Sequence, residues 1–172
     1  MKVYDGSSEG SAEPRKDRVK VGIAEYDVTT DGAALTTSGL GSCLGVAMYD
    51  ERAGVAGLVH VMLPSADEVD GSNPAKFADS GIEELLDAME REGADPGHVR
   101  AKVAGGSDML DFSENGSGIG VRNIEQVERT LDDLGIPIEE KDVGGDHGRS
   151  LRLEGASGRL VVRSANKGEQ TI

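Results

Sequence analysis

The hairpin around which this chain is organised is encoded in residues 43–60, CLGVAMYDERAGVAGLVH. Two apolar segments, residues 44–49 and 54–62, flank the polar sequence DERA, and this arrangement predicts two antiparallel strands joined by a turn. With a loop of two or four residues, Cys43 lies opposite His60. Directly opposed side chains have Cβ atoms roughly 4.5–5.5 Å apart, so the spacing predicts that the thiol meets the imidazole.

The pairing register of this hairpin leaves an alternative open. A three-residue loop, or a bulge near Gly54, shifts the pairing by one residue and sends the two side chains to opposite faces. A free cysteine on a strand is most often a small buried hydrophobe, and a lone histidine is most often a surface or hydrogen-bonded core residue. Cys43 is the single cysteine, so no internal disulfide explains it.

The side chains of the hairpin alternate between two faces. Both faces are apolar or small, so both should be covered, and this favours a layered α/β arrangement. One face is predicted to hold Leu44, Val46, Met48, Val55, Val59 and Val61, and the other Cys43, Gly45, Ala47, Ala56, Leu58 and His60.

Length and charge narrow the class of protein. A chain of 172 residues fits one domain that buries its core without disulfides. Thirty-two acidic against eighteen basic residues give a net charge of −14, which repels phosphate backbones and argues against nucleic acid as a partner. Only seven of the basic residues are lysine, and this acidic, lysine-poor composition is typical of proteins from high-salt cytoplasm. Without a long apolar stretch or a signal-peptide pattern, we expect a cytoplasmic protein with no membrane insertion.

Periodicity and turn residues predict the remaining elements. We expect a disordered polar tail at residues 1–18 and one domain at residues 19–172. The predicted class is α/β, a single layered domain of mostly antiparallel β-sheets, or sandwich, covered by two main helices. One helix follows the Asn73 cap and closes at Gly93, and the second begins near Asn123. The other predicted strands are residues 19–28, 33–37, 99–104, 138–143, 150–153 and 159–163.

Six short motifs, in this order, resemble those of the chemoreceptor glutamine deamidases, the CheD family. Each is weak alone, but six in sequence make a chance resemblance improbable, and the similarity covers about residues 19–168. The motifs are Leu40-Gly41-Ser42-Cys43, His60-Val61-Met62-Leu63-Pro64, Ala104-Gly105-Gly106-Ser107, Gly120-Val121-Arg122-Asn123, Asp142-Val143-Gly144-Gly145 and Arg149-Ser150.

The resemblance implies a Cys–His–Thr site that hydrolyses particular glutamine side chains of chemotaxis receptors to glutamate. Cys43 and His60 match the first two catalytic positions. The third falls on Thr37, with Thr36 and Ser38 as neighbouring hydroxyls that a small register error would substitute.

The residue types support this chemistry independently of the family. A thiol reacts as thiolate and needs a nearby base, which an imidazole supplies. The thiolate would attack the carboxamide carbon, the imidazolium would protonate the departing ammonia, and water would then hydrolyse the thioester. Thr37 would hold the other ring nitrogen, the part that Asp or Asn plays in other thiol hydrolases.

Glycine-rich junctions supply candidate substrate-binding and oxyanion-stabilising residues. The backbone N–H groups at Gly41 and Ser42 would form an oxyanion hole, or the glycines simply make a tight turn. The sequence Gly105-Gly106-Ser107 would line the substrate groove or end a strand. Arg122 and Asn123 would brace the site, or Asn123 would cap the second helix.

The resemblance also carries partner expectations and an alternative function. CheD-like proteins bind the CheC phosphatase, so the chain is expected to meet a receptor cytoplasmic domain and a CheC-type phosphatase, and its main role is alternatively that of a regulatory binding module. A redox role for Cys43 ranks last, because no resolving cysteine exists. We expect a monomer that uses no cofactor and no metal, since three scattered histidines and one cysteine form no zinc spacing.

Overall fold

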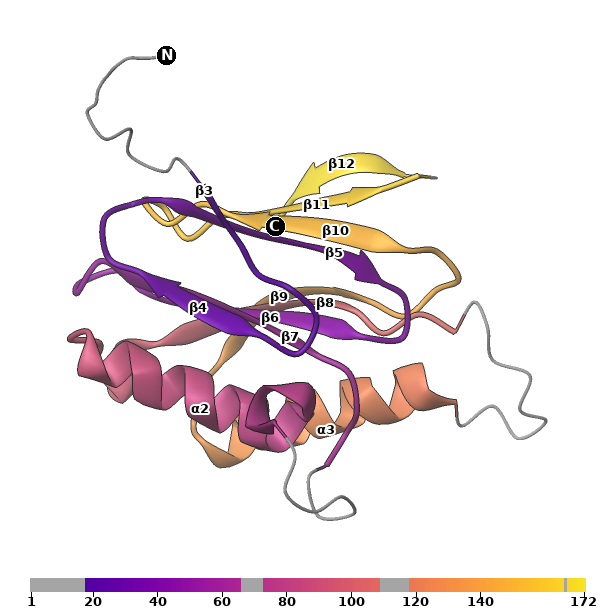
Figure 1. Cartoon of the computed structure of the whole chain (residues 1–172), viewed down its shortest axis with the longest axis horizontal. Coiled ribbons are helices and arrows are strands. Elements are labelled where there is room, and N and C mark those ends of the chain that lie inside the picture. Colours follow the sequence, from indigo (N-terminus) through magenta and orange to yellow (C-terminus); the bar gives the residue numbers. More distant parts are fainter. Residues whose placement is uncertain (1–17, 66–72, 109–117, 166) are drawn as a thin grey trace.

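The computed structural model describes residues 18–65, 73–108, 118–165 and 167–172. Within these ranges, two five-stranded sheets stack face to face, and two α-helices cover one of them (Figure 1). The order of the layers is therefore sheet, sheet, helices. This confirms the predicted α/β class and the sandwich covered by two helices. The predicted tail lies outside the described residues, except for Arg18.

We call the two sheets the outer sheet and the central sheet. In spatial order, the outer sheet comprises β12 (Gly168–Thr171), β11 (Leu160–Ser164), β10 (Arg149–Leu153), β5 (Ala34–Leu40) and β3 (Arg18–Lys20). The central sheet comprises β4 (Tyr26–Thr29), β7 (Val55–Val61), β6 (Leu44–Asp50), β8 (Arg100–Gly105) and β9 (Ile138–Val143). The pairs β3–β5 and β8–β9 are parallel, and the other neighbours are antiparallel.

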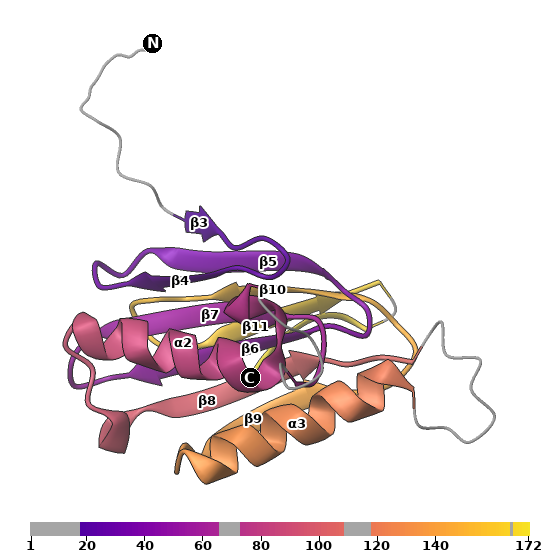
Figure 2. The ribbon, with the colours of Figure 1, turned by 60° about the horizontal axis from the view of Figure 1, so that its bottom comes forward.

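The helices α2 (Ala78–Arg91) and α3 (Ile119–Asp133) lie side by side on the face of the central sheet that is turned away from the outer sheet (Figure 2). Helix α2 packs against β4 and β7, and α3 packs against β9. Two 3₁₀ turns, η2 (Pro74–Lys76) and η3 (Pro96–His98), precede α2 and β8. The central sheet is therefore covered on both faces, as its apolar strands require.

The hairpin β6–β7 has a register two residues away from the predicted one. Gly45 pairs with His60 and Asp50 with Val55, so the loop comprises residues 51–54 and Cys43 does not lie directly opposite His60. Gly54 has φ +70° and belongs to the loop, a backbone conformation that favours glycine. The predicted pairing was therefore wrong.

The predicted faces of the hairpin are nevertheless correct, because a shift of two residues preserves the alternation. Leu44, Val46 and Met48 lie in the core under the helices, and Ala47 and Leu58 lie in the core between the sheets. Cys43 packs against the inter-sheet core. Cys43 therefore shares the inter-sheet face with His60, one diagonal step away, where neighbours are about 7–8 Å apart.

Three further expectations need correction. The predicted strand 19–28 is two strands, β3 and β4, in different sheets, because the chain turns at Gly22 to Ala24, where Ala24 has φ 61°. Asn73 caps the turn η2 rather than α2. The second helix begins at Ile119, four residues before the predicted start.

Candidate active site

The connection from β5 to β6 places Cys43 between the two sheets. Strand β5 belongs to the outer sheet and β6 to the central sheet, so residues 41–43 cross from one layer to the other. Gly39, with φ +77°, begins this change of direction. The crossover leaves Cys43 half-buried at one end of the inter-sheet layer.

A hydrogen bond joins the two sheets next to this crossover. Thr37 Oγ1 on β5 lies 2.8 Å from His60 Nδ1 on β7, and both side chains are buried. Thr36 and Ser38 are more exposed, because alternate residues of β5 face away from the central sheet. The geometry therefore selects Thr37, among the three neighbouring hydroxyls, as the partner of His60.

The imidazole of His60 has one partnered and one unpartnered nitrogen. The side chain is 0% exposed, and within the described residues Nε2 is buried without a hydrogen-bond partner. Burial lowers the pKa of His60 below its usual value of 6.5. The ring is therefore neutral at pH 7. If Nδ1 carries the proton and donates it to Thr37 Oγ1, the lone pair of Nε2 remains available to accept a proton.

Burial also governs the thiol. It raises the pKa of Cys43 above the ordinary value, so the resting side chain is a neutral thiol. Desolvation disfavours both the thiolate and the imidazolium. The site thus suits a base that removes the thiol proton as the thiol attacks, rather than a preformed ion pair.

Three hydrogen bonds fix the backbone that carries Cys43. Ser107 N donates to Gly41 O at 2.8 Å, and Gly106 N donates to Cys43 O at 2.8 Å. Asn123 Nδ2 donates to Ser42 O at 2.9 Å. Each backbone carbonyl of residues 41–43 thus accepts a hydrogen bond.

Asn123 links the crossover to the end of β7. Its Nδ2 also donates to Met62 O at 2.9 Å, and the side chain is 0% exposed inside α3. The alternative in which Asn123 caps the helix is therefore wrong, since Gly118 occupies the N-cap position. This amide joins the segment that carries the thiol to the strand that carries the imidazole.

The glycines at the end of β8 allow close backbone approach. A Cβ on Gly105 would collide with Cys43 O, and one on Gly106 would lie 2.6 Å from the Ile124 side chain. Their φ values of +120° and +73° also favour glycine. Gly105, Gly106 and the buried Ser107 therefore pack closely against the backbone of the crossover. This packing explains the glycines without a role in lining a substrate groove.

The amide groups of the crossover differ in their availability. Gly41 N donates to Gly39 O at 3.1 Å, so that N–H is already engaged. Within residues 18–65, 73–108, 118–165 and 167–172, the N–H groups of Ser42 and Cys43 donate to no acceptor. Of the predicted oxyanion donors, Ser42 therefore remains, and the amide of Cys43 joins it.

A second buried link between the sheets was not assigned a role from the sequence. Arg149 on β10 donates through Nε and Nη2 to the carboxylate of Asp142 on β9, at 3.4 and 3.3 Å. The Arg149 side chain is 1% exposed. Asp142 pairs with Ala104, Ala104 with Gly45, and Gly45 with His60, so both links lie on one cross-strand row. Both residues stand in the quoted motifs, but their contact depends on the stacking of the sheets.

Arg122 is not brought to Cys43. It is exposed on α3 and lines a cavity of about 280 Å³ with Pro64, Phe77 and Gln126. This position does not support the prediction that Arg122 braces the site, and it agrees with the alternative in which Arg122 belongs to the start of the second helix.

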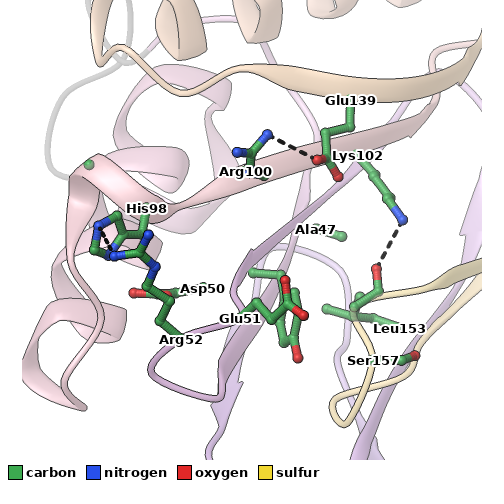
Figure 3. Close-up of a pocket in the computed structure, with 13 residues that line it drawn as sticks. Ala47, Asp50, Glu51, Arg52, His98, Arg100, Lys102, Glu139, Leu153 and Ser157 are labelled. Atoms are coloured by element: carbon green, nitrogen blue, oxygen red, sulfur yellow. Dashed lines mark hydrogen bonds and ion pairs between the residues drawn. The ribbon is translucent and has the colours of Figure 1, made fainter.

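A large cavity lies at the opposite end of β6 from Cys43. It has a volume of about 450 Å³ and contains Tyr49, Arg52, Arg100 and Lys102 among its lining residues (Figure 3). Tyr49 is six residues along the strand from Cys43, or about 20 Å at the usual rise. This cavity is therefore separate from the thiol and imidazole.

In the described part of the chain, no group of three or more His, Cys, Asp or Glu side chains is arranged to hold a metal ion. None of the described helices is long and apolar enough to span a membrane.

Comparison with known proteins identifies the family. The family model for CheD chemotactic sensory transduction matches residues 62–164. A probable chemoreceptor glutamine deamidase CheD of Haloarcula marismortui is 60% identical over 173 residues, which cover 100% of both chains. The chain belongs to the CheD family. Because the full-length match includes Thr37, Cys43 and His60, the assignment extends over the candidate site, which lies before the segment matched by the family model.

Two further proteins extend the comparison. The chemoreceptor glutamine deamidase CheD of Halalkalibacterium halodurans is 41% identical over 160 residues, which cover 91% of this chain and 99% of that protein. A Neisseria meningitidis protein of family DUF152 has a crystal structure with a TM-score of 0.51 and 14% identity, covering 76% of this chain and 65% of that one. The second likeness concerns the fold alone. Haloarcula marismortui is a halophile, which agrees with the high-salt interpretation of the acidic composition.

Proposed function

We propose that this CheD chain is a protein-glutamine glutaminase, which hydrolyses side-chain amides of chemoreceptor glutamines to glutamate with release of ammonia. The relatives that cover the whole domain are named for this activity. The observation that carries the proposal is the buried Thr37–His60 hydrogen bond, which leaves Nε2 of the ring without a partner among the described residues, while Cys43 packs against the same inter-sheet layer. Each part of the mechanism follows from these three residues.

In the first half-reaction, His60 Nε2 removes the thiol proton as Cys43 Sγ attacks the amide carbon. Negative charge then develops on the former carbonyl oxygen, where the N–H groups of Ser42 and Cys43 donate to it. The C–N bond breaks, the imidazolium returns its proton to the leaving nitrogen, and ammonia departs. The substrate remains attached to the enzyme as a thioester.

In the second half-reaction, neutral His60 removes a proton from water as the water attacks the thioester carbon. The C–S bond breaks, the proton passes to sulfur, and glutamate is released. Thr37 keeps the ring in one orientation through both steps because its hydroxyl accepts from Nδ1–H in the neutral and in the protonated ring. Thr37 is thus proposed as a positioning residue.

A receptor cytoplasmic fragment tests this proposal. The protein is incubated with the fragment, and each glutamine is followed by mass spectrometry for the mass gain that accompanies replacement of the amide by a carboxylate. We expect gains at a subset of glutamines with the wild-type chain and none with Cys43→Ala. Unchanged gains with Cys43→Ala would refute the thiol mechanism, and no gains with the wild type would refute the activity.

We further propose a CheC-type phosphatase as a partner, from the family resemblance. Binding is measured with purified phosphatase immobilised on a resin. Retention of Cys43→Ala as well as wild type is expected if the phosphatase does not contact the thiol. Loss of retention with that variant would place the partner over the catalytic crossover, and failure of both proteins to bind would remove the partner.

A further inference from the structure

Within the described residues, one face of the outer sheet is open to solvent. Both described helices pack on the central sheet, so no described helix covers the opposite side of the outer sheet (Figure 1). Its strands alternate accordingly: Leu151 and Leu153 are buried between the sheets, whereas Arg152 is exposed. A cavity of about 400 Å³ hollows the open side.

Basic side chains gather on this open side. Arg18, Lys20, Arg152 and Arg163 line the hollow, and we call them the cationic face. Two carboxylates, Glu154 and Glu169, also line it. Basic side chains therefore outnumber acidic ones here, whereas the whole chain has 32 acidic and 18 basic residues. The side chains that line the hollow therefore carry a net positive charge, whereas the net charge of the whole chain is negative.

Strand pairing sets the spacing of the basic side chains. Lys20 pairs with Thr36, and Thr36 pairs with Arg152, so the three form one row across β3, β5 and β10. Strands two apart are separated by about 10 Å. Ser150 pairs with Arg163 in the neighbouring row. Thr36 and Ser150 thus place hydroxyl groups between the basic side chains of the cationic face.

The nearby carboxylates leave these cations available. Arg163 and Glu169 form an ion pair of 2.7 Å, but their side chains are 70% and 54% exposed. Arg152 lies 3.9 Å from Glu154. Exposed pairs of this kind contribute only about 0–1 kcal/mol. Among the residues that the structure describes, Arg18 and Lys20 have no ion-pair partner.

The cationic face adjoins β5, the strand that carries Thr37. Thr36, Thr37 and Ser38 all line the hollow, although the hydroxyl of Thr37 is bonded to His60 on the inner side. From Ser38, the hollow extends back along β5 to the level of Ala34, which pairs with Arg18, or about 13 Å. A polypeptide whose glutamine enters beside Cys43 would reach this face around the end of β5.

We propose that the cationic face binds a carboxylate-rich segment of the receptor that flanks the target glutamine. This inference rests on the proposed deamidation and adds where the substrate docks and which charge it carries. A polypeptide segment brings a few carboxylates into local contact, whereas a nucleic acid also meets the repulsion of the −14 net charge.

The test compares the double variant Lys20→Glu/Arg152→Glu with the matched control Arg129→Glu/Lys141→Glu. The control makes the same change of net charge at exposed positions on α3 and β9. With the receptor fragment as substrate, we expect the KM of the double variant to rise about tenfold over the control, with kcat unchanged. The ratio should shrink as KCl increases toward about 1 M, where the Debye length is near 3 Å.

The outcomes distinguish this inference from the proposed function. Equal KM values for the two double variants, with wild-type turnover intact, overturn the docking surface but leave the deamidase. If the wild type sediments as a dimer that Lys20→Glu/Arg152→Glu dissociates, the face binds a second copy of the chain, and the receptor assignment is wrong. Absence of any turnover with the wild type refutes the activity itself. Circular dichroism of each variant at the assay salt excludes unfolding as the cause of a change in KM.

Discussion

His60 and Asp50 are buried polar residues at opposite ends of the same hairpin, and their surroundings differ. Asp50, 1% exposed, accepts from the backbone N–H groups of Asp95 at 2.8 Å and Ala53 at 3.2 Å. His60, 0% exposed, has a partner only at Nδ1 within the described residues. A buried polar atom without a partner costs free energy. The comparison therefore separates a residue that closes a turn from one whose unpartnered nitrogen fits the proposed role as a base.

The pKa values of the two residues reflect the same difference. Burial alone would raise the pKa of Asp50, but the N–H groups of Asp95 and Ala53 outweigh it and lower the pKa below 3.8. Burial lowers the pKa of His60 and keeps the ring uncharged. One end of the hairpin therefore stabilises a charge, and the other excludes one.

The largest expected effect is on catalysis at the His60 end. His60→Gln keeps a polar side chain of similar reach but removes the base, so kcat on the receptor fragment should fall by about 100- to 10,000-fold. The thermal unfolding midpoint is measured in parallel and should change little. A His60→Gln protein that retains wild-type turnover would show that another group removes the thiol proton.

The positioning role of Thr37 predicts a smaller loss. Thr37→Val keeps the shape but removes the acceptor for Nδ1–H, so kcat should fall by about 10- to 100-fold, because the ring tautomer and orientation are no longer fixed. Thr37→Ser restores the hydroxyl and should recover most of the activity. Equal rates for the Val and Ser variants would contradict the proposed role.

Asp50 offers the matching stability experiment at the other end. Asp50→Asn removes the charge that the two backbone N–H groups stabilise, and the free energy of unfolding should fall by about 1.5–3 kcal/mol, with kcat unchanged. The lowered pKa also sets the pH response. The contribution of Asp50 is complete above the unfolded pKa and is lost as the pH falls through the folded pKa. A urea titration at neutral and acidic pH measures both effects, and a variant as stable as wild type would contradict them.

The pH profile of wild-type turnover sharpens the contrast for His60. Because activity requires the neutral ring, kcat/KM should fall as the pH drops through the pKa of His60, and this acid limb should lie below about 6.5. At about pH 5.5, one unit below the usual histidine pKa, an enzyme that depends on an ordinary histidine would retain about a tenth of its activity. This enzyme should retain more at the same pH, because the pKa of His60 is lowered. An acid limb above 6.5 would mean that a negative charge faces the ring.

The smallest effect is expected at the exposed rim of the large cavity. Arg100 and Glu139 form a 3.2 Å ion pair, but their side chains are 61% and 41% exposed (Figure 3). Arg100→Ala should therefore change the free energy of unfolding by about 0.5 kcal/mol or less and leave kcat unchanged. A tenfold loss of turnover in this variant would connect the large cavity to catalysis and break the comparison between the two ends.

Alternation along the hairpin was predictable from the sequence, but its register was not. The apolar pattern identified both faces correctly because it depends only on the parity of the positions. The direct pairing of Cys43 with His60 failed because Gly54 belongs to the loop rather than to β7, and a loop displaced toward higher residue numbers changes the register by two. Nothing local in the sequence distinguishes Gly54 as a strand residue from Gly54 as a loop residue.

The supporting residues around Cys43 were harder to predict than Cys43 itself. Asn123 was predicted either to brace the site or to cap the second helix, although its spacing from Val127 and Leu131 fits the buried stripe of α3. That periodicity would have identified a buried amide, but not its acceptors, Ser42 O and Met62 O. The Arg149–Asp142 link was inaccessible to pattern analysis, because its partners belong to different sheets and meet only when these stack.

The bond between Thr37 and His60 has a consequence for how this protein loses activity. The proposed base belongs to one sheet and the hydroxyl proposed to orient it to the other, so this arrangement exists only while the two layers are docked. A slight parting of the layers would separate the hydroxyl from the ring while each sheet kept its own ladder of backbone hydrogen bonds. Inactivation by heat or denaturant should then precede the loss of β-structure, and turnover would serve as a sensitive gauge of the contact between the layers.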